Sequence, residues 1–263
     1  MARVRGNLET IGIQLTMRAI LLAAGSGRRL QRPFPKCLVD IGGMTLLSRM
    51  LRALAAVEVT EAWVVVGYRH ELITEELERC PSPVSVVCVR NEAFLRGSVR
   101  SLWAARGAMS GEVLVMDADV LFPVQLLRRL VQSPHGNCVL GDPRSSFSGE
   151  EMMLTIHGDR VWDITRGVRD PLHVLGEGVG FYKLDRSAAH SLRGLLEAWV
   201  ASGRDHEEYE EVFRALFKSC VFGYELVGDL PWTEIDFPED IDKAEQSVWP
   251  RIQALEAAPM EPR

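Results

Sequence analysis

Apolar and polar positions follow two alternating patterns through the first half of the chain. Short continuous apolar runs rich in Val and Ile occur at residues 19–24, 62–67, 84–89 and 112–117. Such runs are typical of strands buried on both faces of a parallel sheet. Helical periodicity separates these runs, at residues 45–56, 71–79 and 98–108. A strand–helix–strand order of this kind predicts right-handed crossovers and a doubly wound α/β sheet.

The pattern changes after residue 136. Shorter strand-like segments joined by Gly and Asp turns indicate an antiparallel or mixed extension of the sheet: NCVLGD, MMLTIHGDRVWDITR and LGEGVGFYKL. Helices return at 187–200 and 206–216, and a last one begins after Pro238 with acidic residues in its first turn. We expect one α/β domain over residues 17–250, built on a doubly wound, mostly parallel mixed sheet flanked by helices. Residues 1–16 are predicted to be a mobile extension and residues 251–263 a C-terminal tail.

Composition narrows the class of protein. The chain has 263 residues and a net charge of −6, which argues against a general nucleic-acid or anionic-membrane binder. Its five cysteines form no CxxC pair, which fits a reduced cytoplasm and neither a disulfide framework nor a zinc site. No apolar stretch approaches the ~20 residues that span a bilayer. We therefore expect a cytoplasmic protein that binds neither nucleic acid nor membrane.

Basic residues gather on the loop after the first predicted strand, in AILLAAGSGRRLQRPFPKCL. A glycine-rich turn at this place suggests phosphate binding, because bare backbone N–H groups can surround an anion. The dinucleotide fingerprint GxGxxG fails, since position 30 is Leu, and no Walker A pattern occurs. Small residues followed at once by cations, with Pro35 before Lys36, still favour an anion site over an incidental cluster.

The stretch LAAGSGRRL…PK resembles the signature LAAGxGxR(L/M)…PK of the nucleotidyltransferases that make nucleotide-activated sugars and alcohols. In that family the loop wraps the triphosphate of an NTP. The resemblance implies that Arg29 and Lys36 are catalytic and neutralise phosphate charge near the reacting α-phosphorus. It also implies nucleotide-binding roles for the rest of the loop, namely Leu22, Ala23, Ala24, Gly25, Ser26, Gly27 and, at a variable position, Arg28.

Two acidic stretches lie far apart in the sequence. VLVMDADVLF places Asp117 and Asp119 at the end of the fourth predicted strand, where ligands bind in such folds and a carboxylate can hold Mg²⁺. In WTEIDFPED, Glu234 and Asp236 are two apart, so on a strand they face the same side. This stretch resembles EIDxxED of the CTP:phosphocholine and CTP:phosphonate cytidylyltransferases. The resemblance implies Asp119 and Asp236 as Mg²⁺ ligands, and Asp117 as support for the turn or the ribose.

Further residues are assigned through the same resemblance. Gly67 matches a recurring glycine, and Asn91, Ser98 and Ser101 match polar positions near the nucleobase, although Ser98 equally fits a helix cap. The acceptor pocket is expected around GEGVGFYKL, with Glu177, Tyr182 and Glu234, the last also open as a metal ligand. Other aromatic candidates are Trp162, Tyr209 and Trp232. An aromatic group beside a carboxylate suits a cationic amine, although aromatics at strand spacing also fit a core.

The predicted activity is transfer of CMP from CTP to a small phosphomonoester or phosphonate, such as phosphocholine or aminoethylphosphonate, with release of pyrophosphate. No general base is required, because a phosphomonoester with a second pKa of ~6 is already largely dianionic. The alternatives are a sugar-1-phosphate nucleotidyltransferase using UTP, GTP or dTTP, a glycosyltransferase with a DxD-type metal site, and a non-catalytic nucleotide-sensing domain. The oligomeric state stays open, with a homodimer among the options.

Overall fold

The computed structural model describes residues 17–145, 149–167 and 173–257. The first half of the chain forms β1 (Arg18–Ala23), β2 (Asp40–Ile41), β3 (Met44–Thr45), α1 (Leu46–Ala55), β4 (Glu61–Val66), α2 (His70–Arg79), β5 (Ser85–Arg90), α3 (Ser98–Ala104), β6 (Val113–Asp117), β7 (Val120–Leu121) and α4 (Val124–Gln132). The second half forms β8 (Cys138–Asp142), β9 (Met153–His157), β10 (Arg160–Thr165), β11 (Val174–Leu184), α5 (Arg186–Ala201), α6 (Tyr209–Ser219), β12 (Gly223–Leu226), β13 (Thr233–Glu234), α7 (Pro238–Lys243) and α8 (Trp249–Ala257).

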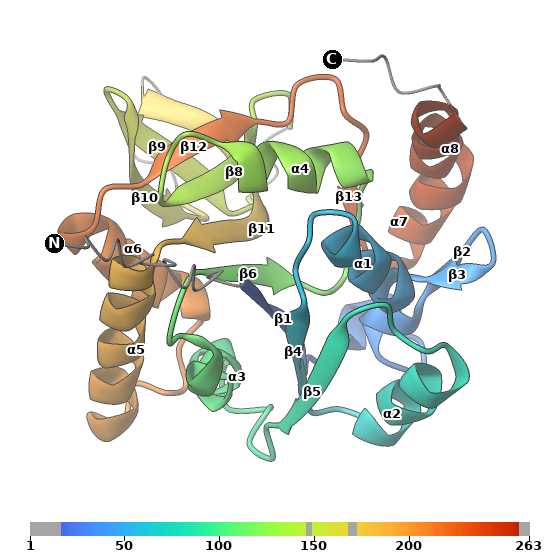
Figure 1. The fold of residues 1–263 in the computed structure, drawn as a ribbon, viewed down its shortest axis with the longest axis horizontal. Coiled ribbons are helices and arrows are strands. Elements are labelled where there is room, and N and C mark those ends of the chain that lie inside the picture. Colours follow the sequence, from blue (N-terminus) through green and yellow to red (C-terminus); the bar gives the residue numbers. More distant parts are fainter. Residues whose placement is uncertain (1–16, 146–148, 168–172, 258–263) are drawn as a thin grey trace, which may run out of the picture.

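One sheet runs through the centre of the molecule (Figure 1). Within the described residues its main path is β10-β9-β11-β6-β1-β4-β5, while β8 pairs with β11 and β12 pairs with β8. The pairs β1–β4, β1–β6 and β4–β5 are parallel, whereas β11 runs antiparallel to β6, β8 and β9. The predicted doubly wound, mostly parallel sheet with a mixed extension is confirmed.

Helices cover both faces of this sheet. Ile20 and Val115 face one core, built with α3, α5 and α6, while Leu21 and Met116 face a second core built with α1, α2 and α4. Because successive strand residues point to opposite faces, a continuous apolar run fills both cores at once. This arrangement explains why the strands of the parallel half carry no polar alternation.

A third, smaller core holds the loop after β1 against the C-terminal part of the chain. It contains Leu30, Ile41, Leu121, Ile235 and Val248. Leu30 comes from the loop and Ile41 from β2. Leu121 lies in β7, Ile235 directly follows β13, and Val248 lies in the π-helical turn before α8. Burial of their side chains therefore brings the cationic loop and the acidic stretch of residues 232–240 to the same edge of the sheet.

The predicted helices match the observed ones within three residues at their starts, and α4 adds a helix that the sequence analysis does not predict. The boundary expected at residue 250 falls inside α8, whose Ile252 is buried, so the last described helix packs on the domain. The predicted extension over residues 1–16 lies outside the described residues. All five cysteines are free thiols in this structure.

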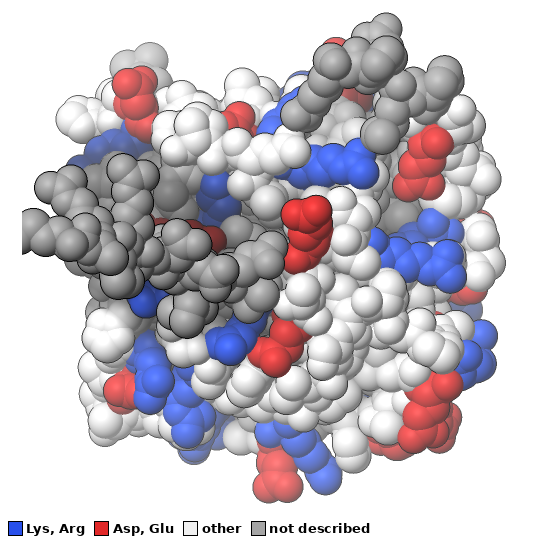
Figure 2. All heavy atoms as spheres, viewed as in Figure 1, with Lys and Arg blue, Asp and Glu red and all other residues white. Residues whose placement is uncertain are grey.

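The surface carries charges of both signs. Figure 2 shows lysines, arginines and acidic residues scattered among neutral ones on the face seen in Figure 1. None of the described helices combines the length and the apolar character needed to cross a membrane.

Candidate active site

The loop after β1 is shaped by close backbone contacts. The N–H of Tyr68 donates to the carbonyl of Ala24 at 3.1 Å. A Cβ at Gly67 would lie 2.8 Å from that same carbonyl oxygen, so glycine permits the approach. Gly27 adopts φ +57°, and a Cβ there would meet the Lys36 side chain at 3.0 Å. The two glycines thus allow β1 to turn sharply and bring Lys36 under the loop.

Arg29 and Lys36 reach the two predicted metal ligands directly. The Lys36 Nζ lies 3.0 Å from Asp119 Oδ2 and also forms an ion pair with Asp236. Arg29 pairs with the other oxygen of Asp236 at 2.6 Å, and its guanidinium lies 5.1 Å from the centre of the Phe237 ring. Four predicted site residues from three separate segments therefore meet at one place. Their catalytic and metal-binding roles stay predictions.

Lys36 is more enclosed than a loop residue usually is, with 17% of its side chain exposed. Burial alone would lower its pKa, but the carboxylates of Asp119 and Asp236 outweigh burial and raise the pKa above its ordinary value. The ammonium group is therefore charged at neutral pH. It can neutralise phosphate charge, and it cannot serve as a base.

Three carboxylates could hold a cation here. Asp119, Glu234 and Asp236 each offer an oxygen within 4.8 Å of the others. The backbone N–H of Ile235 donates to the carbonyl of Asp119 at 2.9 Å, which ties the two acidic segments together. Partial enclosure and repulsion by Asp119 and Asp236 raise the pKa of Glu234, although the residue keeps contact with solvent. An all-oxygen donor set of this kind fits Mg²⁺.

Asp240 has a structural task that its first-turn position only partly indicates. Its Oδ2 accepts the backbone N–H groups of Asp236 and Phe237, at 2.9 and 2.8 Å. These two bonds begin α7 and fix the turn on which Asp236 sits. Glu150 was also missed by the sequence analysis, and it pairs with Arg29 at 3.2 Å. Its position on a loop between strands gives no local signal for that contact.

Asp117 has different partners from Asp119. Its Oδ2 accepts a hydrogen bond from the Tyr209 hydroxyl at 2.7 Å. Burial, followed by repulsion from Asp119 and Glu210, raises the pKa of Asp117. The predicted role of Asp117 in supporting the turn or the ribose stays a prediction. Tyr209, a candidate for the acceptor pocket, contacts Asp117 and does not line the cavity described below.

The polar residues of the predicted nucleobase segment bond to one another and to the start of α6. Asn91 Nδ2 donates to Ser101 Oγ at 3.0 Å, and both residues are buried. The Ser98 Oγ accepts the backbone N–H of Tyr209 at 2.7 Å, so this serine does not cap its own helix. Asn91 and Ser101 therefore brace the start of α3, and base contacts by these residues stay a prediction.

A cavity of about 610 Å³ opens beside the acidic edge. Glu177 of β11, Trp232 and Glu234 line it, and burial raises the pKa of Glu177. The Trp232 Nε1 donates to Asp142 Oδ2 at 2.8 Å, which fixes the indole in the wall. Acidic residues outnumber basic ones along the wall, with Asp142, Glu150, Glu151, Glu177, Glu234, Asp236, Glu239 and Asp240 against Arg144, Lys243 and Arg251.

Two aromatic candidates lie elsewhere. Tyr182 is 2% exposed and stacks on Phe213 with ring centres 3.9 Å apart, so it lies in the core, and its predicted place in an acceptor pocket stays a prediction. The ring faces the core because position 182 points to the α5–α6 side of β11. Trp162 is exposed on β10, where the Lys218 Nζ lies 3.9 Å from the centre of its ring. Neither side chain lines the cavity.

Comparison with known proteins agrees with this geometry. The chain is 30% identical over 236 residues to the bifunctional IPC transferase and DIPP synthase of Rubrobacter xylanophilus, covering 88% of this chain and 51% of that protein. It is 32% identical over 127 residues to the CMP-5'-(3-aminopropyl)phosphonate synthase of Streptomyces rubellomurinus, covering 47% of this chain and 20% of that protein. The chain thus spans about half the length, or less, of these curated relatives.

The fold is shared with solved nucleotidyltransferases. The inositol-1-phosphate CTP transferase of T. maritima superposes with a TM-score of 0.71 at 19% identity, covering 93% of this chain and 98% of that one. The model of the MobA-like NTP transferase domain matches residues 19–170, which include the cationic loop, Asp117 and Asp119. The chain belongs to the family of MobA-like NTP transferase domains.

Proposed function

We propose that the protein transfers CMP from CTP to a small phosphomonoester or phosphonate and releases pyrophosphate. The observation that carries this proposal is the convergence of Arg29 and Lys36 with Asp119 and Asp236 at the edge where β1 and β6 end. Cations for a triphosphate and carboxylates for its counter-cation are both required to grip a free NTP, and ligands bind at this edge in such folds.

The residues of the chain act through position and charge. Lys36 and Arg29 stabilise the negative charge that moves from the α-phosphorus toward the leaving pyrophosphate. Asp119 and Asp236, with Glu234 beside them, would hold Mg²⁺, which when bound neutralises phosphate oxygens. The phosphate group of the acceptor is already largely dianionic at neutral pH, so no side chain has to remove a proton.

Cytosine is the proposed base because two similar proteins are named for CMP or CTP. The Streptomyces relative is named for a CMP-linked product, and the solved neighbour from T. maritima is named a CTP transferase. A site that accepts from the cytosine amino group leaves buried acceptors facing uracil oxygens. Each such mismatch costs about 1–3 kcal/mol, which corresponds to roughly ten- to several-hundred-fold selectivity for one or two contacts.

The acceptor is proposed to carry a cationic amine. The acidic wall with Glu177 and Trp232 suits an ammonium group, whereas the phosphate or phosphonate end faces Lys36 and Arg29. Aminoethylphosphonate and phosphocholine meet this description, and inositol 1-phosphate, a polyol, does not.

The test is pyrophosphate release with Mg²⁺, each of CTP, UTP, GTP and dTTP, and a panel of acceptors. We expect kcat/KM to be highest with CTP and an amine-bearing acceptor. Preference for UTP, GTP or dTTP with a sugar 1-phosphate would contradict the proposal and favour the sugar-nucleotide branch. No turnover with any pair, despite nucleotide binding, would favour a nucleotide-sensing domain.

A further inference from the structure

Asp117 and Asp119 are two residues apart, and their side chains have different partners. Asp119 faces the cations of the loop, with its Oδ2 3.0 Å from the Lys36 Nζ. Asp117 instead accepts the Tyr209 hydroxyl at 2.7 Å. β6 ends at Asp117, so Asp119 already lies in the turn beyond the strand. Tyr209 thus contacts the carboxylate that does not belong to the proposed cation site.

The Asp117 carboxylate, which accepts the Tyr209 hydroxyl, lies against Gly180 of β11. A Cβ at this glycine would lie 2.2 Å from Asp117 Oδ2. The glycine also adopts φ +78°, which residues with a Cβ rarely do. The absence of a side chain at Gly180 therefore leaves space for the Asp117 carboxylate beside β11. The placement of this carboxylate depends on β6, β11 and α6 together.

Tyr209 is held firmly at the start of α6. It is 4% exposed, and its ring meets Phe213 edge-on with ring centres 5.9 Å apart. Its backbone N–H donates to Ser98 Oγ at 2.7 Å, and the Val99 N–H donates to the carbonyl of Glu207 at 3.2 Å. The start of α6 is thereby bonded to the start of α3.

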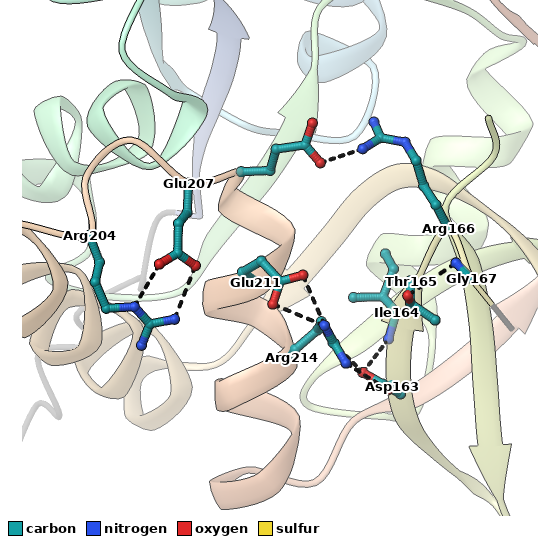
Figure 3. Close-up of polar contacts among 10 residues, drawn as sticks. Asp163, Ile164, Thr165, Arg166, Gly167, Arg204, Glu207, Glu211 and Arg214 are labelled. Carbon is teal, nitrogen blue, oxygen red and sulfur yellow. Dashed lines mark hydrogen bonds and ion pairs between the residues drawn. The ribbon is translucent and has the colours of Figure 1, made fainter. Parts of the chain in front are cut away.

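The helix that carries Tyr209 is anchored to the sheet as well. Arg214 of α6 pairs with Asp163 of β10 at 2.7 Å and with Glu211 at 2.9 Å (Figure 3). Arg204 and Glu207 form a two-bond pair in the turn before the helix, also seen in Figure 3. These contacts leave Tyr209 little freedom, which suits a residue that sets the position of another.

We propose that Tyr209 is a positioning residue that holds the Asp117 carboxylate away from the cation site, so that Asp119 alone presents a carboxylate there from this strand end. The proposal rests on the proposed function for its catalytic consequence. A partly enclosed carboxylate without a donor is costly, so a freed Asp117 would turn toward the nearest cation. The proposed cation site at Asp119 and Asp236, where Lys36 also lies, would offer such a partner.

The resulting defect has a specific signature. An extra carboxylate near the site would increase its attraction for a divalent cation, while a crowded donor set would disfavour the Mg²⁺ geometry that keeps several waters. Tyr209→Phe should therefore bind Mn²⁺ about 5-fold more tightly and turn over about 10-fold more slowly with Mg²⁺. The KM for the acceptor should change less than about 2-fold, since Tyr209 does not line the cavity.

The experiment measures Mn²⁺ binding by calorimetry, and kcat and KM with Mg²⁺–CTP, in the full chain. Tyr224→Phe is the matched control, because it removes a hydroxyl from another tyrosine packed on the same core. Tyr209→Phe is also made in an Asp117→Asn background, where it should add nothing to either readout. A melting temperature reports any general loss of stability.

Two outcomes would overturn the proposal. In the first, Tyr209→Phe matches Tyr224→Phe in both readouts. In the second, Mn²⁺ binding weakens together with the melting temperature, which indicates a purely structural role. Absence of turnover in the unaltered protein would instead contradict the proposed function, and the Mn²⁺ measurement would still decide between a positioning role and a structural one.

Discussion

The cationic loop after β1 and the acidic edge formed by β7, β13 and α7 carry opposite charges and are built in opposite ways. The loop owes much of its shape to local chemistry, with Gly27 in a left-handed conformation and Pro35 just before Lys36, besides the bond from the Tyr68 N–H to the Ala24 carbonyl. The acidic edge depends on contacts across the chain, such as the bond from the Ile235 N–H to the Asp119 carbonyl. The loop is therefore predictable from one contiguous stretch of sequence, whereas the meeting of the two acidic segments is not.

Each region neutralises the other in this structure. Lys36 bridges Asp119 and Asp236, and Arg29 bridges Asp236 and Glu150. Binding of a nucleotide with its cation would exchange these internal ion pairs for pairs to phosphate and metal. The net binding free energy contributed by Lys36 or Arg29 is then smaller than its new contacts suggest, because an existing ion pair is lost.

The acidic edge should show the largest effects. Asp236→Asn keeps the shape of the side chain and removes the charge that pairs with Arg29 and Lys36 and that would hold Mg²⁺. We expect kcat/KM to fall by more than ~100-fold, the upper end of what outer-shell changes around a metal cost. Asp119→Asn should lower kcat/KM by a similar factor. Asp242→Asn, an exposed residue of α7, is the matched control, and an equal loss there would refute a specific role.

Substitutions in the cationic loop should give the second-largest loss of activity. Lys36→Met retains most of the enclosed stem and removes the charge, and we expect about a 100-fold loss of kcat/KM, equivalent to about 2.7 kcal/mol of transition-state stabilisation. Arg29→Ala should lose about as much activity, with a smaller change in melting temperature, because Arg29 is 46% exposed and Lys36 17%. Steady-state kinetics and thermal melts check both. Near-normal turnover in either variant would contradict the proposed role of the loop in binding the triphosphate.

The proposed acceptor cavity should show an intermediate effect that depends on pH. Glu177→Gln should raise the KM for aminoethylphosphonate about 5-fold and leave the KM for CTP unchanged, since one partly buried charge is lost. Burial raises the pKa of Glu177, so its carboxylate becomes neutral at a higher pH than an ordinary glutamate. The advantage of the unaltered protein should therefore shrink as pH falls. Glu239→Gln, on the same wall, should change KM less than about 2-fold.

The parallel half of the fold is predictable because its central strands β1, β4 and β6 are largely buried on both faces, whereas β5 lies at the edge of the sheet and is partly exposed. β1, β4, β5 and β6 each coincide with a continuous apolar run, displaced by one residue. The start of α6 was displaced by three residues, from 206 to Tyr209. Residues 205–208 bond to α3 instead, through Asp205 with Arg100 and through the Glu207 carbonyl with Val99. Tertiary contacts of this kind leave no trace in local periodicity.

The candidate site is predictable where a short sequence motif carries each residue, and it is not predictable where tertiary packing sets the direction of a side chain. The signature residues of the loop and both proposed metal ligands meet as expected, whereas Tyr182 lies in the core although its stretch resembles an acceptor segment. Strand alternation also suggests that Asp117 and Asp119 share one environment. They do not, because β6 ends at Asp117 and the backbone changes direction before Asp119. Side-chain direction beyond a strand end depends on the turn, which periodicity does not describe.

The contact between Arg29 and Glu150 should give the smallest effect. The two side chains are 46% and 68% exposed and 3.2 Å apart, so the pair adds little to stability, typically below ~1 kcal/mol. It nevertheless occupies a guanidinium that the triphosphate would use. Glu150→Gln should therefore lower the KM for CTP about 2-fold, and the gain should fade as salt rises and screens the pair. Glu197→Gln, in a similarly exposed pair with Arg193 on α5, is the matched control. A higher KM in Glu150→Gln would mean that Glu150 orients Arg29 for the nucleotide and does not compete with it.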